Sequence, residues 1–238
     1  MDRVFVTGDT HGLMDFNKLK VFCGGRQLDR GDYIIIAGDC GVLWSQELKA
    51  EYISEFESLG VTILFIDGNH ENFDMLKSLP EMELLGGKVH KVSDNIYHLM
   101  RGEIFNICGK KILALGGGES NDTSGRVEHK TWWADERITK EDYDNTVTNL
   151  AKYNNAVDIV ISHMPPTKIL PLIEEELTCC GEELPWYIVP KLIPRISNDY
   201  LQDIASVVEC DRWFYGHIHL ENKFGKFIGI YDRIVELK

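Results

Sequence analysis

The chain has 238 residues, of which 44% are hydrophobic and 26% are charged, close to the average of globular proteins. This composition excludes collagen-like repeats and argues against a coiled coil or a disordered chain. With 25 Lys and Arg against 38 Asp and Glu, the formal net charge is −13, which argues against a protein that coats long nucleic acid through its phosphates. A small phosphorylated substrate, or a nucleic-acid end held at a local positive site, is still compatible with this charge.

The length fits one large domain or two small ones, and no internal repeat, low-complexity tract or linker divides the sequence. We therefore predict a single domain over residues 1–238. No apolar stretch reaches the roughly 18 residues that a membrane-spanning helix needs, and no long apolar segment opens the chain. These features predict a cytoplasmic protein with no membrane partner. The oligomeric state cannot be read from the sequence.

From the N-terminus onward, one layout recurs five times: a short apolar run ends, and a polar loop with Gly, Asp, Asn or His follows. The runs are residues 4–6, 33–37, 61–66, 159–161 and 213–215. Continuous apolar runs of this length predict strands buried on both faces. Amphipathic helices are predicted between them, over residues 48–59 and after N-caps at Thr139 and Ser197. This alternation predicts an α/β fold.

Two further segments have strand patterns. Residues 95–115 contain three apolar runs with turn signals between them, which predicts an antiparallel meander. Two runs near the C-terminus, residues 227–231 and 234–235, predict strand as well. His90 and His98 lie in or near strand patterns away from the five polar loops, so we interpret them as structural or surface residues.

The five polar loops follow predicted strand ends, where open α/β sheets bind their ligands. They offer carboxylate, amide and imidazole groups: Asp9, His11, Asp39, Asn69, His70, His163, His217 and His219. Such groups suit Mn, Fe, Zn, Ni or Co, and the absence of thiolates from these loops argues against a structural zinc site. A single Gly-Asp pair or His-x-His triplet is a weak signal, but five such loops in this order together predict a metal site.

Five motifs carry a resemblance to a known family: Gly8-Asp9-Thr10-His11-Gly12, Gly38-Asp39-Cys40-Gly41, Gly68-Asn69-His70-Glu71, Ser162-His163 and Gly216-His217-Ile218-His219. As a set they resemble the calcineurin-like metallophosphoesterase superfamily. The resemblance implies a four-layer fold, in which two mixed β-sheets pack as a sandwich flanked by helices. Gly116 to Gly118, Arg126 and the pair Trp132-Trp133 add a weaker similarity to small bacterial and phage-type members.

The resemblance also implies a site with two divalent cations, for which we favour manganese without excluding Fe, Zn, Ni or Co. Carried over by motif, the first cation takes Asp9, His11 and His219, the second takes Asn69, His163 and His217, and Asp39 bridges both. In the family, a His at the position of His70 contacts the substrate phosphate and assists the leaving group. His70 is therefore the predicted catalytic residue.

These features predict a metal-dependent phosphoesterase that hydrolyses a phosphomonoester or a phosphodiester with a hydroxide held by the two cations. A small phosphate ester is the expected partner. One alternative is a nuclease or cyclic-nucleotide phosphodiesterase acting on short nucleic-acid substrates. Another is a binding scaffold that has kept the fold without catalysis, although the complete set of predicted ligands argues against it.

The second motif departs from the family pattern. Many phosphatases of the superfamily carry a further Asp in the form GDxxDR, and Val42 stands at that position here. The sequence therefore leaves open which group orients His70. Trp44, two residues further on, is either a packing residue or part of the rim of the site.

A long polar segment after residue 118 extends to about residue 141, and loops of this length tend to be functional. We predict Arg126 and His129 as substrate contacts, because an Arg binds phosphate in bidentate fashion. Arg126 could equally pair with a nearby acid. The pair Trp132-Trp133 either stacks on a base or anchors the loop in a small core, and we favour the second interpretation.

Overall fold

Two β-sheets make up the centre of the protein in a computed structural model that describes residues 2–179 and 183–238. The seven-stranded sheet has, in spatial order, β13 (Val235–Glu236), β1 (Val4–Thr7), β2 (Tyr33–Ile36), β3 (Thr62–Phe65), β6 (Ile96–Leu99), β5 (Gly87–Lys91) and β4 (Glu81–Leu84). The six-stranded sheet has β11 (Asn222–Phe224), β12 (Phe227–Gly229), β10 (Arg212–Tyr215), β9 (Ile159–Ser162), β8 (Lys110–Leu115) and β7 (Ile104–Ile107). Both sheets are mixed, with parallel strands in the middle and antiparallel strands at the edges.

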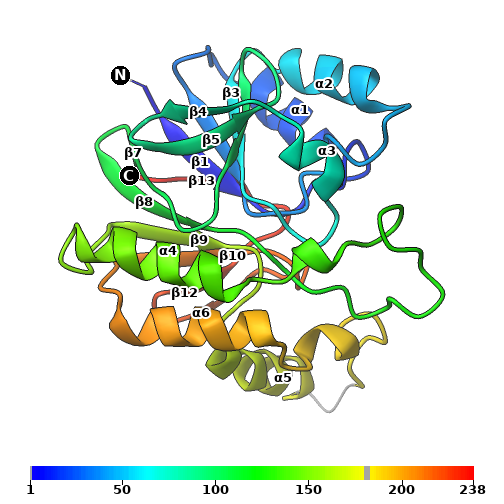
Figure 1. The fold of residues 1–238 in the computed structure, drawn as a ribbon, viewed down its shortest axis with the longest axis vertical. Helices are drawn as coiled ribbons and strands as arrows, with labels where there is room; N and C mark the ends of the chain where they lie inside the picture. Colours follow the sequence, from blue (N-terminus) through cyan, green and yellow to red (C-terminus); the bar gives the residue numbers. More distant parts are fainter. Residues whose placement is uncertain (1, 180–182) are drawn as a thin grey trace.

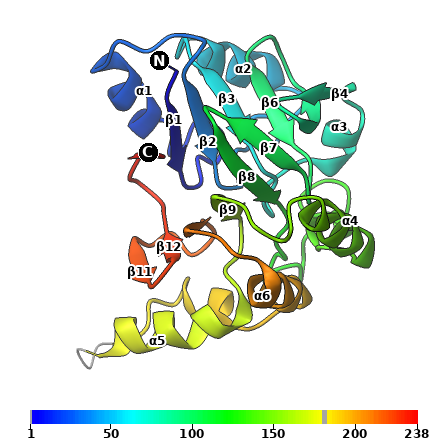
Figure 2. The same cartoon turned by 90° about the vertical axis from the view of Figure 1, so that its left-hand side faces the viewer.

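Helices cover the outer face of each sheet (Figures 1 and 2). On the seven-stranded sheet these are α1 (Asn17–Gly24), α2 (Lys49–Glu57) and α3 (Phe73–Lys77). On the side of the six-stranded sheet are α4 (Lys140–Ala151), α5 (Leu170–Thr178) and α6 (Ile196–Val207). Short 3-10 helices lie at Ala134–Glu136, Thr167–Ile169 and Val189–Leu192. This arrangement confirms the predicted sandwich of two mixed sheets flanked by helices.

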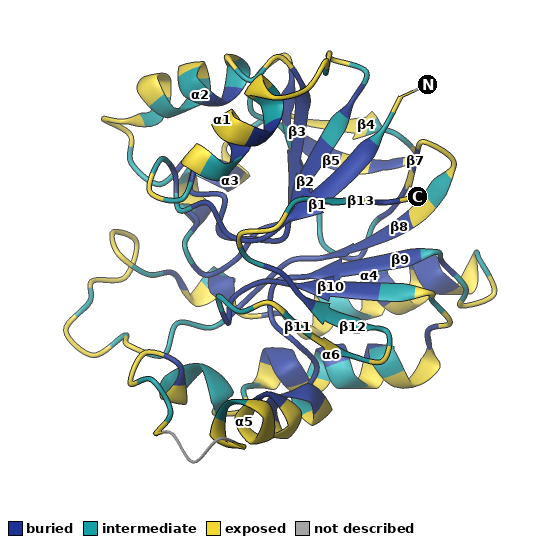
Figure 3. Ribbon diagram, turned by 180° about the vertical axis from the view of Figure 1, so that it is seen from behind, coloured by how far each residue is buried: buried dark blue, intermediate teal, exposed yellow. Residues whose placement is uncertain are grey.

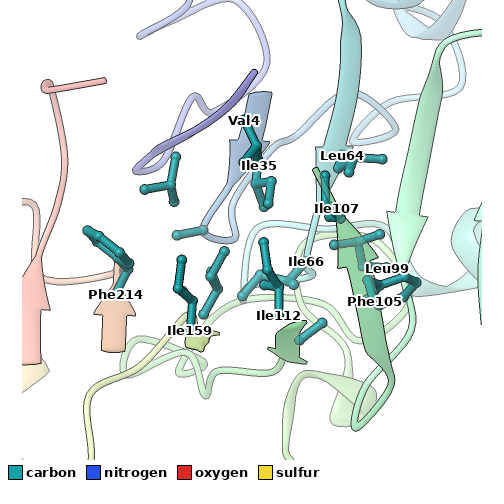
Figure 4. Close-up of a cluster of buried hydrophobic side chains, with 14 of the residues drawn as sticks. Val4, Ile35, Leu64, Ile66, Leu99, Phe105, Ile107, Ile112, Ile159 and Phe214 are labelled. Carbon is teal, nitrogen blue, oxygen red and sulfur yellow. The ribbon is translucent and has the colours of Figure 1, made fainter. Parts of the chain in front are cut away.

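The two sheets pack face to face through alternate residues of their strands (Figure 4). Val4 of β1 and Ile35 of β2 point into this interface, as do Ile112 of β8 and Phe214 of β10. The intervening residues, such as Phe5, point to the opposite face and pack under the helices. Because both faces are covered, the strands are apolar throughout, as the continuous apolar runs predict.

The strands are largely buried, and the helices that cover them are exposed on the side that faces solvent (Figure 3). Phe56 of α2 packs with the strand residues of the seven-stranded sheet. Leu150 of α4 and Leu201 of α6 pack with Trp213 of the six-stranded sheet, and the indole Nε1 of Trp213 donates to the Ser162 hydroxyl at 2.8 Å. The predicted Thr139 N-cap is present, since its hydroxyl accepts from the Asp142 amide. No helix of the described ranges is long and apolar enough to cross a lipid bilayer.

Two predictions of local structure are wrong. Residues 95–115 do not form one meander, because β6 pairs with β3 and β5 in one sheet while β7 and β8 pair in the other. The chain crosses between the sheets after β6, and pairing between distant strands decides this rather than local turn signals. Ser197 is not an N-cap but lies inside α6, where its hydroxyl accepts from the Ile138 amide at 3.0 Å.

A buried polar network lies between β3 and the antiparallel strands β5 and β6. The carboxylate of Asp67 accepts from Arg101 at 2.6 Å and from His98 Nε2 at 2.9 Å. His98 Nδ1 lies 2.9 Å from Nδ1 of His90, and the two rings stack with an interplanar angle of 8°. When His98 donates to Asp67 from Nε2 as a neutral ring, its Nδ1 accepts and His90 donates. The two histidines are therefore structural, in agreement with the sequence interpretation.

This pair predicts a pH-dependent stability. Burial and the neighbouring His98 lower the pKa of His90 from 6.5 to about 4, so between these pH values the unfolded chain binds a proton that the folded protein does not. The free energy of unfolding must therefore fall as the pH drops from about 6.5 to about 4. We expect urea unfolding of His90→Gln, which keeps a donor toward His98, to depend less steeply on pH over this interval. Equal slopes for the two proteins would contradict this.

Candidate metal centre

Three overlapping groups of side chains, each able to hold a metal ion, lie where the polar loops of the two sheets meet. They are Asp9, His11 and His219; His11, Asp39 and His70; and Asp39, His163 and His217. Within each group the potential ligand atoms lie within 4.8 Å of one another. The ends of five strands in two sheets thus contribute to a single cluster, and the seventh predicted ligand, Asn69, adjoins the third group. The coordination roles that the resemblance implies for these residues stay predictions.

Asp39 lies at the middle of the cluster and belongs to two of its groups. One carboxylate oxygen, Oδ1, accepts from the backbone amide of His70 at 2.7 Å. The other, Oδ2, lies 3.3 Å from Nε2 of His163 and 3.5 Å from Nε2 of His11. One oxygen therefore organises the neighbouring loop, and the other faces imidazoles from both predicted metal sites.

Asp9 occupies the corresponding place in the first group and is fully buried. Its Oδ2 atom lies 3.0 Å from Nε2 of His219 and 4.0 Å from Nε2 of His11. Its Oδ1 atom accepts from the backbone amide of His217 at 3.1 Å. The loop after β1 is thereby joined to the loop after β10, which lies in the other sheet.

His163 and Asn69 approach each other in the second group. His163 donates from Nδ1 to the carbonyl of Ala37 at 2.9 Å, which turns Nε2 toward Asp39 and places it 3.2 Å from the amide oxygen of Asn69. His217 packs edge-on against His163, with ring centroids 5.0 Å apart. Its Nε2 atom is buried and has no hydrogen-bond partner among the residues that the structure describes.

A buried polar atom without a partner is costly, and a cation would provide one for His217. The negative charges of Asp9 and Asp39 also favour a cation at this place. Burial raises the pKa of Asp9 and that of Asp39, but the surrounding imidazoles outweigh it, so that both carboxyl groups have a lowered pKa. Two buried anions side by side require cations. The donor set of carboxylate, imidazole and amide therefore fits divalent metal ions.

Two histidines of the cluster have raised pKa values, so their protonated forms are favoured beside this negative charge. Burial lowers the pKa of His11, but its contacts with Asp39 raise it to about 9, and the same opposition raises the pKa of His163 to about 9. Both rings face Asp39 through Nε2. These rings would have to be neutral to hold a divalent cation, so metal binding would be coupled to proton release.

The loops at the cluster are tightly packed and partly strained. Four of the predicted ligands adopt a left-handed backbone: His11, Asp39, His217 and His219. Each such residue costs of the order of 1–3 kcal/mol, which the surrounding contacts must offset. A Cβ on Gly68 would lie 2.1 Å from Oδ1 of Asp39, so this position accepts no side chain. The glycine of the third motif is thus required for close approach of two loops.

Two acidic residues outside the predicted ligands hold the cluster in place. Asp15 accepts from Nδ1 of His11 at 2.7 Å, which turns Nε2 of that ring toward Asp9 and Asp39. Glu71 is buried and accepts from the backbone amide of Cys40 at 2.7 Å, which anchors the loop of Asp39. Sequence reasoning assigned neither role. The spacing of Asp15 four residues after His11 is the one signal that could have indicated the first.

A partly buried lysine also supports the first group. Lys18 of α1 donates its ammonium to the carbonyls of Gly8 and Asp9, at 3.2 and 2.7 Å, and to the carbonyl of Tyr231. The ring of Tyr231 in turn stacks on His219, with centroids 4.6 Å apart. Lys18 thus ties the loop after β1 to the C-terminal segment that backs His219.

Arg126, one of the two predicted substrate contacts, lies close to the cluster but has protein partners. Its guanidinium donates to Asp122 at 2.6 Å, to the Ser120 hydroxyl at 3.1 Å and to the carbonyl of Thr131. The Ser120 hydroxyl also accepts from the side-chain amide of Asn69 at 3.4 Å, so Ser120 links Arg126 to a predicted ligand. Arg126 therefore pairs with a nearby acid, Asp122, as one of the two sequence interpretations held.

His129 and the two tryptophans lie further along the same segment. His129 is 62% exposed, and its Nδ1 lies 3.1 Å from Asp74 of α3. Trp133 is fully buried and donates from Nε1 to Asp74 at 2.8 Å, which agrees with the anchoring role favoured from sequence. Trp132 is partly buried.

His70 is held by rings rather than by a carboxylate. Its imidazole packs against Trp44, with centroids 5.7 Å apart, and against His11, with centroids 5.3 Å apart. Burial lowers the pKa of His70, and the charge of Asp39 opposes this without reversing it. His70 also belongs to the group of His11 and Asp39, so its position is compatible with metal binding as well as with proton transfer.

The contact between Asp15 and His11 predicts a measurable effect on metal binding. Partners that orient a ligating histidine typically contribute 10- to 100-fold to metal affinity. We expect Asp15→Asn to weaken Mn²⁺ binding by about this factor in calorimetric titrations. Asp144→Asn, which changes an exposed acid on α4, is the matched control and should bind as the unaltered protein does. Unchanged affinity in Asp15→Asn would show that His11 does not need this contact.

Comparisons with known proteins agree with this geometry. The lariat debranching enzyme of Drosophila pseudoobscura pseudoobscura is 25% identical over 162 residues, which cover 67% of this chain and 28% of that protein. The lariat debranching enzyme of Schizosaccharomyces pombe is 27% identical over 187 residues, covering 70% of this chain and 37% of that protein. The chain thus spans about a third of the length of these relatives.

Among solved structures, the phosphopantetheinyl hydrolase PptH of Mycobacterium tuberculosis is 13% identical, with a TM-score of 0.48. The alignment covers 97% of this chain and 88% of that one. The model of the family described as calcineurin-like phosphoesterase matches residues 2–221, almost the whole chain. With the five motifs gathered at one cluster between two mixed sheets, this match shows that the chain belongs to the calcineurin-like phosphoesterase family.

Proposed function

We propose that this protein is a metal-dependent phosphoesterase that hydrolyses a small phosphodiester, with phosphomonoesters as the second class of substrate. The observation that carries the proposal is the set of three overlapping metal-binding groups centred on Asp39. Membership of the calcineurin-like phosphoesterase family supports hydrolysis of phosphate esters. The similarity to lariat debranching enzymes favours diesters over monoesters.

In this proposal Asp9, His11 and His219 hold one divalent cation, Asn69, His163 and His217 hold a second, and Asp39 contacts both. When bound, such cations supply Lewis-acid activation of water and neutralise charge on the phosphate. Manganese is the cation we would load first. The protein contributes fixed positions, because Asp15, Ala37 and Lys18 hold the ligand loops from behind. Little reorganisation is then needed when the substrate binds.

His70 has the position expected of a group that serves the leaving oxygen. Its ring lies beside Asp39 and His11, at the edge of the cluster, and is only partly buried. Departure of an alkoxide from phosphorus requires a proton or an equivalent stabilisation of negative charge. We propose that His70 donates that proton as the ester bond breaks. Because burial lowers the pKa of His70, this role requires the negative phosphate of the bound substrate to favour the protonated ring.

The surrounding charges bear on which substrates reach the site. The net charge of −13 disfavours a long polyanion, whose many phosphates would meet an acidic exterior. A small phosphodiester, a cyclic nucleotide or a short single strand presents few phosphates. We therefore place long duplex nucleic acid outside the proposed substrates.

The proposal is tested by presenting monoesters and diesters side by side to the Mn²⁺-loaded protein. We expect turnover of bis-aryl and nucleoside diesters, with less turnover of aryl monoesters. Asp39→Asn and His163→Ala should each reduce turnover to background, while circular dichroism shows that the fold survives. Asp144→Asn is the control for an acid outside the cluster. Full activity in either cluster variant would overturn the assignment of the site, and no turnover of any ester would favour a binding scaffold.

Removal of His70 tests the leaving-group role separately. We expect His70→Ala to lower kcat/KM by about 10²- to 10⁴-fold for diesters with a poor, alkyl leaving group, which is the usual contribution of proton transfer. Nitrophenyl esters, whose leaving group needs no proton, should lose less than about tenfold. Equal losses for both kinds of ester would count against a general acid and would favour a role of His70 in binding metal or phosphate.

A further inference from the structure

Many phosphatases that this chain resembles carry a further Asp three residues after the second motif's Asp, and this chain lacks it. Val42 occupies that position and is fully buried in the apolar cluster under the helices. Among the residues that the structure describes, none forms a hydrogen bond with the His70 imidazole; the bond of His70 to Asp39 uses the backbone amide. A ring without a fixed partner can rotate, and rotation would move its nitrogens away from a substrate oxygen. Something else must restrict this ring.

Trp44 is the large side chain that packs on His70 from outside the cluster of predicted ligands. The two rings are tilted by 51° with centroids 5.7 Å apart, within the range of attractive aromatic contacts. The other ring beside His70 belongs to His11, itself a predicted ligand. His70 therefore lies between one ring held by the cluster and one ring held by the surrounding protein.

Trp44 is itself fixed from two sides. Its backbone carbonyl accepts from the side-chain amide of Asn72 at 3.3 Å, and its amide donates to the carbonyl of Gly41 at 3.2 Å. Its indole packs edge-on against Trp133, with centroids 5.6 Å apart. Trp133 is fully buried and is bonded through Nε1 to Asp74 at the start of α3. The contact on His70 thus has a rigid support that runs back into the core.

We propose that Trp44 is the positioning residue for His70, replacing by ring packing the carboxylate that the family pattern supplies. The indole restricts rotation of the imidazole, and Trp133 holds the indole in place. Packing of this kind orients the ring without determining which nitrogen carries the proton, unlike a carboxylate, which accepts from one nitrogen. The inference deepens the proposed function and rests on it, because it requires His70 to act on the leaving group.

A double-mutant cycle on the Mn²⁺-loaded protein of 238 residues tests the proposal with the same pair of good and poor leaving groups. We expect Trp44→Ala to lower kcat/KM for the alkyl diester by about 10- to 100-fold, part of the effect of removing the histidine. The nitrophenyl diester should change by less than about threefold, with KM little altered for either. Trp44→Phe, which keeps a ring against His70, should restore most of the loss.

The double variant decides whether Trp44 acts through His70. Trp44→Ala with His70→Ala should be no slower than His70→Ala alone, since residues that act as one unit are not additive. Multiplied losses in the double variant, or an equal loss for both esters in Trp44→Ala, would overturn the proposal. If His70→Ala shows no leaving-group dependence, the proposed role of His70 fails. If the loss in His70→Ala depends on the leaving group and the loss in Trp44→Ala does not, only the proposed role of Trp44 fails.

A measurement that does not depend on activity completes the test. The ring current of Trp44 should shift the imidazole proton resonances of His70, which are assigned by their loss in His70→Ala. Trp44→Ala should move these resonances and leave those of His90 in place, whereas Trp186→Ala, which removes an indole that is 85% exposed, should move neither. If Trp44→Ala does not fold, Trp44→Leu fills the volume without a ring and has the same expected outcomes. Unshifted His70 resonances would show that the contact is absent in solution.

Discussion

Two carboxylates, Asp9 and Asp39, are buried side by side at the ends of neighbouring parallel strands. The groups that surround them balance this buried negative charge. Repulsion between the two carboxylates in a poorly solvated site would destabilise the fold unless positive charge balanced it. Imidazoles from both sheets face the two side chains, and Lys18 binds the backbone of the same loop from behind. The electrostatic arrangement of the metal-free protein is thus already suited to divalent cations.

The loops that carry these groups are held by contacts that lie outside the cluster. Asp15 orients His11, and Glu71 anchors the loop of Asp39 through backbone amides. Behind the loop of Asn69, Asp67 is bonded to Arg101, whose guanidinium also donates to the carbonyls of residues 135, 136 and 137. Arg101 thereby fastens the long segment after β8 to a loop that carries predicted ligands. These supports explain how strained, left-handed residues persist at the site.

The long segment after β8, residues 116–139, contacts the cluster at two places. At one end Arg126 and Ser120 approach Asn69, and at the other Trp133 supports Trp44, which packs on His70. Chemistry and selectivity are commonly divided in this way, with a conserved type of centre supplying reactivity and loops supplying choice of substrate. A change of sequence in this segment would therefore alter both the surroundings of Asn69 and the packing of Trp44 on His70.

The sequence by itself determined the strand-end motifs and an α/β fold, and the family resemblance that those motifs carry implied the sandwich of two mixed sheets and the residues that meet at the cluster. Apolar runs that end in Gly-Asp, Gly-Asn-His or His-Ile-His carry this information locally, because side-chain type and spacing report both burial and ligand chemistry. Tertiary structure alone decided that β6 and β7 belong to different sheets, that Arg126 pairs with Asp122, and that the Trp44 ring packs on the imidazole of His70. Asp15 and the His90–His98 pair belong to this second class as well. Each depends on how side chains pack in three dimensions. Even at the short spacings of His11 with Asp15 and of Arg126 with Asp122, the sequence does not show which acid a side chain meets.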